Sequence, residues 1–450
     1  MVSAREETAR ILKKLGYKTI TLDASATRYG AVETVAEGKI YARFLKENEG
    51  KFDGVILFLP NFGDENGAVA ALKDAGVPIF VQAYPDELDK MSPDLRRDAF
   101  CGKMSIMDVF YQNNIKFTAL KPHAVAPESK AFASNMDHFD RVCRVVKALK
   151  NLIVGAIGAR TSAFKTVRID ELALQKHGIT METFDLSDVF SRMAGIKENS
   201  AAFKSKAETL KNYTDFSCVP AGAFKKITQL GLVLDNMREE YGLDTIAVRC
   251  WIEMQQQLGI SPCVLLSEMN HRHLTSACEV DVGNAVMMHA LRIDSGEASA
   301  CLDWNNNYGD DDDKCILFHC GPVPQSMMVA RGEVTDHDIL QNAVGKGCSY
   351  GCNVGRIKPM PMTFGSMMTD AGKLKYFIGE GEFTADCIPD EFFGCAGVAK
   401  IPRLQDVLLY LGQNGHRHHV SVTPGHFTAV LSEALEYYLG YDVTRPQLLK

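Results

Sequence analysis

The sequence predicts an α/β protein with two doubly wound α/β domains followed by a β-rich C-terminal domain. Repeating strand–loop–helix units fill the first part of the chain, and a second series of such units begins near residue 151. Beyond residue 295 the pattern changes to short strands separated by turns. Because 450 residues exceed what one hydrophobic core can organise, we expect domains at 1–150, 151–293 and 294–450.

The first domain is expected around a buried parallel strand. Gly54–Leu59 is a continuous apolar run that stops at a proline, the pattern of a strand covered on both faces. Hydrophobic periodicity predicts helices at 3–15, about 30–47 and 66–75, and strands at 17–22, 54–59 and 78–82. Doubly wound sheets normally open on a strand, so the helical start leads us to expect that a first strand is missing from this sequence.

The second domain contains two short strands that each run into a carboxylate. The turn at Gly158-Ala159 lacks the G-x-G-x-x-G fingerprint, so tight strand-to-helix packing is favoured there over phosphate binding. Strands are expected at 153–157, 244–253 and about 274–280, and helices at about 135–149, 170–177, 187–195, 222–241, 253–258 and 283–292. The polar segment 196–215 has little strand signal.

The third domain is expected to be a sheet or a barrel that returns to helix near 403–413 and 425–438. The polar stretch Asn305–Lys314, with four consecutive aspartates, is interpreted as a solvated hairpin loop, with a cation site as the alternative. The predicted strands are Ala298–Trp304, Cys315–His319, Met327–Ala330, Cys348–Val354, Pro361–Met367 and Lys373–Gly379.

The composition excludes several classes of protein. Hydrophobic residues make up 46% and charged residues 23%, as in ordinary globular proteins, and the net charge of −7 comes without a long basic run that would indicate nucleic-acid binding. No apolar run reaches membrane-spanning length. The charged N-terminus is no secretory signal, so the thirteen cysteines predict a reducing, cytoplasmic location.

The pairs Cys315/Cys320 and Cys348/Cys352 lack zinc-knuckle spacing and are interpreted as core or loop thiols.

Acidic residues at the ends of two predicted strands are the first candidates for a functional site. Glu253 follows the apolar run 246–252, where a charge without a partner would be costly. Glu279 and Asp281 lie on the same side of an extended chain, so one of them can bind a metal while the other orients it. For Asp281, helix N-capping is the alternative. Open α/β sheets bind ligands at such strand ends, which predicts a site here if the two strands are neighbours.

Histidines supply the remaining candidates. His416, His418 and His419 precede an apolar strand at 420–423, and three imidazoles so close together favour at least one metal ligand. Because alternate residues of a strand face opposite sides, His418 and His419 are not expected to reach one metal together. His319 is either a substrate-binding residue or a hydrogen-bonded core histidine. Two carboxylates and one imidazole suit a catalytic divalent ion of the manganese or iron type.

Several segments together have a pattern that resembles a known family. They are Leu59–Glu65, Gln82–Met91, Arg96–Lys103, Gly158–Arg160, Arg249–Glu253, Ala277–Asp281, Leu317–Gly321 and His418–Val420. In combination they resemble the L-fucose isomerase-like proteins, relatives of L-fucose/D-arabinose and L-arabinose isomerases. The resemblance covers nearly the whole chain.

The resemblance implies a three-domain subunit that assembles into a homo-oligomer, a trimer or hexamer, with active sites at subunit contacts. It places a metal triad, which typically holds Mn²⁺, on Glu253, Asp281 and His419. It also implies that a loop at Asn61 and Phe62 binds substrate in a neighbouring subunit.

These residues suit aldose–ketose isomerisation of an open-chain sugar through an ene-diol. A divalent ion polarises the carbonyl, and Glu253 and Asp281 are candidates for the acid/base pair that moves a proton between C2 and C1. The candidate substrates are L-fucose, D-arabinose and 6-modified hexoses such as sulfoquinovose. A non-catalytic two-lobed sugar-binding protein and a metal-dependent sugar aldolase are the alternatives.

Overall fold

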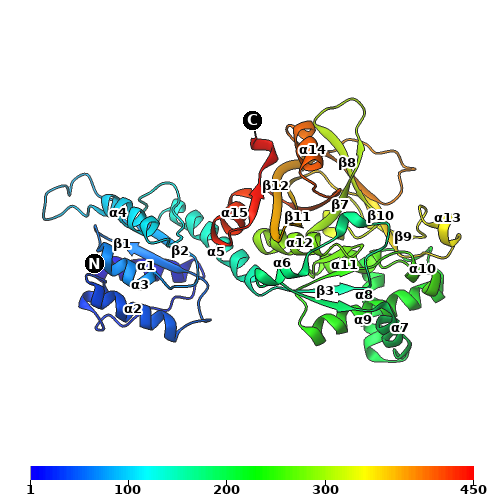
Figure 1. Ribbon diagram of the computed structural model, residues 1–450, viewed down its shortest axis with the longest axis horizontal. Coiled ribbons are helices and arrows are strands. Elements are labelled where there is room, and N and C mark those ends of the chain that lie inside the picture. The colour runs from blue at the N-terminus through cyan, green and yellow to red at the C-terminus, as the bar shows by residue number, and fades with distance from the viewer. Residues whose placement is uncertain (1, 450) are drawn as a thin grey trace. The chain divides into compact units, whose positions relative to one another are not determined.

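The computed structural model describes residues 2–449, which form two compact units (Figure 1). Unit 1 comprises Met1–Lys147 with Tyr437–Leu439, and unit 2 comprises Ala148–Glu436 with Gly440–Lys450. The predicted combination of parallel α/β sheets with a large C-terminal sheet is confirmed. The division of the chain into three domains stays a prediction.

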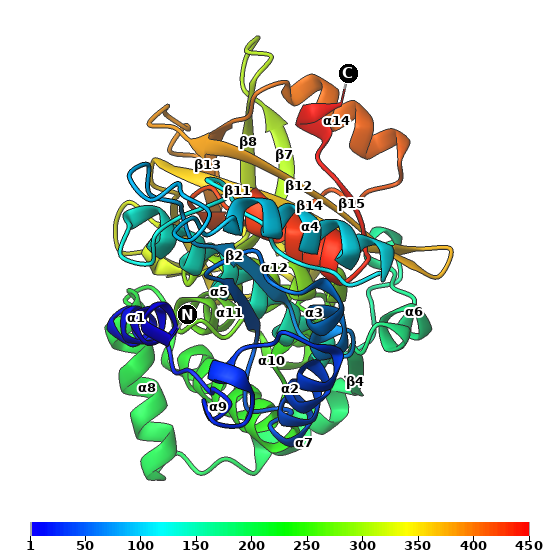
Figure 2. The same cartoon turned by 90° about the vertical axis from the view of Figure 1, so that its left-hand side faces the viewer.

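Unit 1 is built on a two-stranded parallel sheet, β1 (Val55–Leu59) with β2 (Ile79–Ala83). All five residues of β2 are buried, as a strand covered on both faces requires. Helices α2 and α3 pack closely against one another, since a Cβ added to Gly38 would lie 2.4 Å from the carbonyl oxygen of Gly67 (Figure 2). The helices are α1 (Val2–Lys14), α2 (Val35–Glu47), α3 (Glu65–Leu72), α4 (Ala99–Gln112) and α5 (Lys130–Lys150).

The predicted strand at 17–22 is wrong. This segment lies between α1 and α2 without strand structure, and Ile20 is 44% exposed. An alternation of polar and apolar residues occurs in exposed segments as well as in strands. The segment would become a strand only if it packed against a neighbouring strand of the sheet.

The first sheet of unit 2 has four parallel strands in the order β4-β3-β5-β6. The strand that follows β3 in the chain, β4, is added on one side of β3, and β5 and β6 are added on the other side, so the order of the strands switches between β3 and β5. The two strands that run into carboxylates are indeed neighbours, since β5 pairs with β6 from Ile246 to Val248. The strands are β3 (Ile153–Ile157), β4 (Thr180–Phe184), β5 (Thr245–Val248) and β6 (Ser276–Cys278).

Seven helices surround or follow the strands of this sheet. One of them, α8, occupies the polar segment 196–215, where Ser200 caps the helix by accepting a hydrogen bond from the amide of Phe203. They are α6 (Glu171–Lys176), α7 (Leu186–Ala194), α8 (Ala201–Tyr213), α9 (Ala221–Tyr241), α10 (Glu253–Leu258), α11 (Cys263–His271) and α12 (Val282–Ser295).

The second sheet of unit 2 has nine strands, and six of them close on themselves. The antiparallel pairs run β12-β11-β14-β7-β8-β13 and return from β13 to β12, which makes a barrel. The strands are β7 (Ala300–Asn307), β8 (Lys314–His319), β9 (Glu333–Thr335), β10 (Cys352–Arg356), β11 (Met360–Asp370), β12 (Lys373–Phe383), β13 (Cys395–Lys400), β14 (His419–Pro424) and β15 (Asp442–Thr444).

The helices of this region are α13 (Gln341–Val344), α14 (Leu404–Gln413) and α15 (Thr428–Ser432), and a π-helical turn continues α15 over Glu433–Tyr438. The predicted strand Met327–Ala330 is wrong. Pro324 begins a 3-10 turn over Gln325–Met327 instead, and only an isolated bridge joins Met328 to Ile357.

Helix α12 links the two sheets of unit 2. It packs on β3, β5 and β6 of the parallel sheet and on β7, β11 and β14 of the barrel (Figure 1). Its residues are almost all buried, and Gly283 lets the first turn approach the barrel, because a Cβ there would lie 2.3 Å from the carbonyl oxygen of Met367. The N-terminus of α12 is therefore held where residues of both sheets meet.

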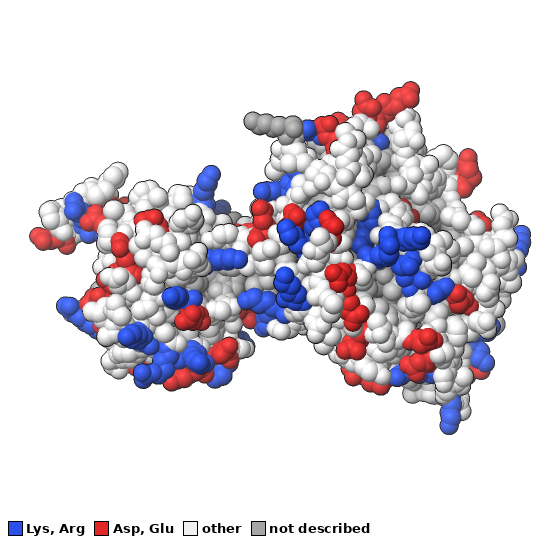
Figure 3. Space-filling view, viewed as in Figure 1, with Lys and Arg blue, Asp and Glu red and all other residues white. Residues whose placement is uncertain are grey.

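The mixed surface charge and the free cysteines of the structure match the expectations from the composition. Basic and acidic side chains are interspersed on the face seen in Figure 3. All thirteen cysteines are free thiols. Within residues 2–449, no helix combines the length and the apolar character needed to cross a membrane.

Candidate metal centre

Three carboxylates and two imidazoles converge where the parallel sheet meets the barrel. The parallel sheet supplies Glu279, in the turn after β6, and Asp281, the N-cap of α12. The barrel supplies Asp303 from within β7, His319 from the end of β8 and His419 from the start of β14. All five side chains belong to unit 2.

His419 is the centre of this group. Its Nε2 atom lies 2.8 Å from Oε2 of Glu279 and 3.2 Å from Oδ1 of Asp303, and its Nδ1 atom lies 2.7 Å from Oδ2 of Asp281. Pairing of β14 with β7 sets His419 directly opposite Asp303, which puts both side chains on one face of the barrel wall. The imidazole thus has carboxylates at both nitrogens.

Four buried polar atoms of this group lack a hydrogen-bond partner among the described residues. They are Nε2 of His419, Oε2 of Glu279, Oδ1 of Asp303 and Nε2 of His319. Unpaired buried polar atoms are costly and rare in folded proteins, and here they cluster around one point. One ligand atom each from Glu279, His319 and His419 lie within 4.8 Å of one another, as a bound cation requires.

Asp281 differs from its neighbours because both of its oxygens are occupied. Oδ1 accepts from the guanidinium of Arg417 and from the amide of Asn284 at 3.0 Å, and Oδ2 accepts from the Asn284 side chain at 2.7 Å. Oδ2 is also the partner of His419 Nδ1. The N-cap alternative for Asp281 is therefore realised, and the same carboxylate fixes the orientation of the His419 ring.

The turn that carries Glu279 has an unusual backbone. Glu279 and Val280 both have left-handed conformations, with φ of 62° and 57°. Such conformations cost about 1–3 kcal/mol each for residues other than glycine and cluster at functional sites. Trp251 Nε1 donates to Oε1 of Glu279 at 3.1 Å, which holds this carboxylate so that Oε2 points at His419.

The electrostatics of the group favour a cation. Burial alone lowers the pKa of His419, but the hydrogen bond to Asp281 and the nearby carboxylates of Glu279 and Asp303 raise it to about 10. Burial raises the pKa of Asp303, whereas Arg417 and His419 outweigh burial and hold the pKa of Asp281 well below its ordinary value. Within the group, only Arg417 is a permanently charged counterion.

The structure brings together two of the three metal ligands predicted from the sequence. Asp281 and His419 are in contact, but Glu253 belongs to none of the metal-binding groups among residues 2–449. Glu253 begins α10, its side chain is 41% exposed, and it pairs with Arg249 at 2.5 Å. The roles predicted for Glu253 and Asp281 remain predictions.

The three clustered histidines have different surroundings. His416 is half-buried against Phe377 and Tyr410, and partial burial lowers its pKa to about 4. His418 approaches the site, with Nε2 at 3.5 Å from Oδ1 of Asp303. The expectation that His418 and His419 diverge is wrong, because β14 begins only at His419 and the alternation of a strand does not extend back to His418.

The other predicted site residues fall in different places. Asn61 and Phe62 follow β1 in unit 1, and Phe62 is 41% exposed. His319 has its Nδ1 as acceptor for the amide of Cys320 at 2.9 Å, so the ring proton belongs on Nε2, which faces the group. Gly158 has φ of 87° and a Cβ there would lie 2.7 Å from Cβ of Arg249, which supports tight packing at that turn.

Three residues of the site were not foreseen. Asp303 lies inside the mostly apolar run Ala300-Cys-Leu-Asp-Trp, and a lone acid within an apolar strand was the available signal. Arg417, 4% exposed, stands between two histidines that drew attention away from it. Phe164 covers the imidazoles of His418 and His419, with ring centroids 5.2 and 5.7 Å away, and nothing in its own loop indicated this.

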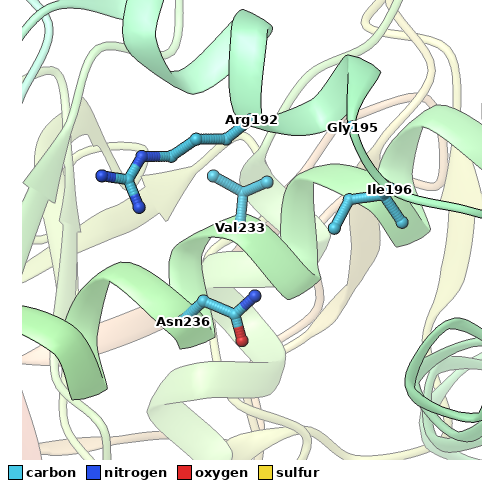
Figure 4. Close-up of a pocket in the computed structure, with 5 residues that line it drawn as sticks. All are labelled: Arg192, Gly195, Ile196, Val233 and Asn236. Atoms are coloured by element: carbon cyan, nitrogen blue, oxygen red, sulfur yellow. The ribbon is translucent and has the colours of Figure 1, made fainter.

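A pocket of about 220 Å³ lies elsewhere in unit 2, between α7 and α9 (Figure 4). Arg192, Gly195, Ile196, Val233 and Asn236 line it, and the guanidinium of Arg192 is already paired with Glu240 and Asp188. It contains none of the metal-centre residues.

The fold and the site define a class of α/β proteins with a candidate metal centre beside a barrel, and comparisons with known proteins identify the family. Residues 1–150 match the fucose/sulfoquinovose isomerase N-terminal domain, and residues 317–445 match the L-fucose isomerase C-terminal domain. The chain belongs to the L-fucose isomerase-like family of aldose–ketose isomerases, so the predicted family and enzyme class are confirmed.

Individual relatives are distant. The chain is 24% identical over 286 residues to a sulfoquinovose isomerase of Alkalicoccus urumqiensis, an alignment that spans 63% of each chain. It is 22% identical over 327 residues to a sulfoquinovose isomerase of Priestia aryabhattai, over 72% of this chain and 71% of the relative. The first of these alignments covers less than two thirds of the relative's length.

Proposed function

We propose that this protein is a Mn²⁺-dependent isomerase of an open-chain aldose, with the metal held by Glu279, Asp303 and His419. The observation that supports this set is that Oε2 of Glu279 and Oδ1 of Asp303 lie 2.8 and 3.2 Å from Nε2 of His419, and that none of these three buried atoms has a hydrogen-bond partner among the described residues. This assignment departs from the triad of Glu253, Asp281 and His419 predicted from the sequence. It keeps His419 and uses the two carboxylates that have free oxygens.

The donor set fits a divalent ion of the manganese type. Two carboxylate oxygens and one imidazole nitrogen leave coordination positions open for substrate, and oxygen-rich sites favour manganese and magnesium over soft metals. Asp281, hydrogen-bonded to Nδ1 of His419, would keep Nε2 unprotonated and directed at the ion. When bound, such an ion polarises the substrate carbonyl as a Lewis acid.

The residues of the chain itself carry out the proton transfer. A carboxylate next to the substrate takes the proton from C2 and returns it to C1, and Glu279 and Asp303 are the two carboxylates beside Nε2 of His419 that could carry out this step. Burial raises the pKa of Asp303, which suits a group that alternates between acid and base. His319 Nε2–H is available to donate to a sugar oxygen, and Phe164 would exclude water from the imidazole side.

For the substrate we propose an aldose with an anionic group at C6, sulfoquinovose being the first candidate because the relatives bear that name. The loop that carries Phe164 also carries Arg160, whose guanidinium donates only to carbonyl oxygens of Thr161 and Ser162. Among the described residues no carboxylate neutralises it, whereas Arg249 is paired with Glu253. An unneutralised arginine on the loop that carries Phe164 suits a sulfonate.

We also propose a homo-oligomer, a trimer or hexamer, in which the loop at Asn61 and Phe62 reaches the site of a neighbouring subunit. Unit 1 has several large apolar side chains on its surface, as a subunit interface would. They are Phe62, Leu88, Met91, Leu95, Phe100, Met104 and Tyr111. Active monomers detected by light scattering at assay concentration would contradict this proposal. The cytoplasmic location stays a prediction.

The function is tested by removing and restoring the metal while a panel of aldoses is assayed for ketose formation. EDTA should abolish activity and Mn²⁺ should restore it, with less recovery from Mg²⁺ or Co²⁺. The panel contains sulfoquinovose, L-fucose and D-arabinose, and Arg160→Met should raise KM for sulfoquinovose more than for the neutral sugars. Full turnover in a metal-free sample would refute the proposal, and cleavage of the carbon chain would favour the aldolase alternative.

A further inference from the structure

Next to the metal centre lies a second cluster, made only of thiols. One sulfur each from Cys263, Cys278 and Cys320 lie within 4.8 Å of one another, and the sulfurs of Cys263 and Cys320 are 3.3 Å apart. Cys352 interacts with both Cys263 and Cys320, and Cys250 interacts with Cys278. We call the four residues Cys263, Cys278, Cys320 and Cys352 the thiol cluster.

The members of the thiol cluster come from four different elements. Cys263 is the first residue of α11, Cys278 the last of β6 and Cys352 the first of β10, while Cys320 directly follows β8. All four are buried, with exposures of 0 to 7%. A single buried cysteine is an ordinary small apolar residue, but three sulfurs within 4.8 Å of one another, with a fourth that interacts with two of them, form a ligand set.

The distances separate a metal site from a disulfide. A tetrahedral zinc ion with Zn–S bonds of about 2.3 Å holds its sulfurs about 3.8 Å apart. The separations among the sulfurs of Cys263, Cys278 and Cys320, from 3.3 Å to at most 4.8 Å, bracket this value, whereas a disulfide needs about 2.05 Å. A disulfide would also use only two of the four thiols and leave the others unexplained.

We propose that the thiol cluster binds a soft or borderline d¹⁰ cation, zinc in the cell, in a closed structural site. Cys263, Cys278 and Cys320 would supply three thiolates and Cys352 the fourth, and each thiol that binds releases its proton to solvent. Four protein ligands leave no open position, so the site is not catalytic. The inference does not depend on the proposed function.

A metal here would fix two residues of the isomerase site. Cys278 immediately precedes Glu279, and Cys320 immediately follows His319. Loss of the zinc would therefore loosen the ends of β6 and β8 and impair turnover without removing any ligand of the catalytic ion.

The test uses the full chain refolded with Co²⁺, because only thiolate ligands give intense sulfur-to-cobalt charge-transfer absorption. We expect this absorption in the wild type and in Glu279→Gln, and its loss in Cys263→Ser and Cys352→Ser. Cys315→Ser is the matched control, since Cys315 is 5% exposed on β8 and belongs to no thiol group among the described residues. Chain expressed with zinc should retain about one zinc ion that dialysis against Mn²⁺ does not displace.

Two results would overturn the inference. The first is a wild-type chain that folds with Co²⁺ but shows no thiolate charge-transfer absorption, a result that does not depend on whether the cysteine variants fold. The second is a thiol count, in denaturant without reductant, that is two below the thirteen of the sequence, since it would mean that the cluster forms a disulfide.

Discussion

The parallel sheet and the barrel of unit 2 contribute to the candidate metal centre in different ways. The parallel sheet provides Glu279 and Asp281 just beyond the end of β6, where the backbone leaves the sheet. The barrel provides Asp303 from the interior of β7, opposite His419 on β14. Ligands at strand ends can be recognised from an apolar run followed by an acid, whereas ligands within a barrel wall depend on strand pairing between distant segments.

The largest effect is expected when the barrel contribution is removed. Asp303→Asn and His419→Ala should each eliminate stoichiometric manganese and turnover, because each variant leaves only two of the three proposed ligands. Bound manganese per subunit, measured beside turnover, checks this. Stoichiometric metal in Asp303→Asn would exclude Asp303 as a ligand.

A smaller effect is expected from the residue that orients the imidazole. Asp281→Asn keeps an oxygen for Nδ1 of His419 but removes the charge that Arg417 neutralises. Losses of this kind weaken metal binding about 10- to 100-fold. We therefore expect Asp281→Asn to bind manganese weakly and to recover turnover at high Mn²⁺ concentration, which metal titration measures. Complete loss at saturating Mn²⁺ would instead support Asp281 as a direct ligand or as the acid/base group.

The helix shared by both sheets gives a prediction about pH. His289 on α12 is buried, and burial lowers its pKa to about 3. As the pH falls below 6.5, the unfolded chain takes up a proton that the folded protein does not. The free energy of unfolding should therefore fall by about 1.4 kcal/mol per pH unit from this residue, and the contribution is fully present above pH 6.5.

His289→Gln should remove that part of the pH dependence, which denaturant unfolding at pH 7 and pH 5.5 can measure. His416→Gln provides a comparison in the barrel region, since burial also lowers the pKa of His416, to about 4. An unchanged pH slope in His289→Gln would mean that α12 opens to water before the protein unfolds.

The smallest effect is expected at Glu253. Because its carboxylate pairs with Arg249 and is 41% exposed, Glu253→Gln should leave bound manganese unchanged and reduce turnover by no more than a few-fold. Metal content and turnover, measured beside Asp303→Asn, decide between the two ligand sets. If Glu253→Gln loses its manganese while Asp303→Asn keeps it, the triad predicted from the sequence is the correct one.

The sequence by itself determined the mixed α/β class and supplied Glu279, Asp281 and His419 as candidates, whereas the pairing of β5 with β6 came from the structure. These candidates follow from local patterns, because an apolar run that ends in an acid is costly unless the acid has a partner. The bounds of the strand at 153–157 could also be predicted, because a single run of apolar residues specifies where this strand begins and ends.

Only the tertiary structure decided which oxygens are free. Asp281 and Asp303 have the same side chain, but Arg417 and Asn284 occupy the oxygens of the first while Oδ1 of the second has no partner among the described residues. The pairing of β14 with β7 sets Asp303 beside His419, more than a hundred positions along the chain, and the tertiary structure also brings the sulfurs of Cys263, Cys278 and Cys320 together from separate elements. No local pattern contains such pairings, because strand order and register depend on contacts between distant segments.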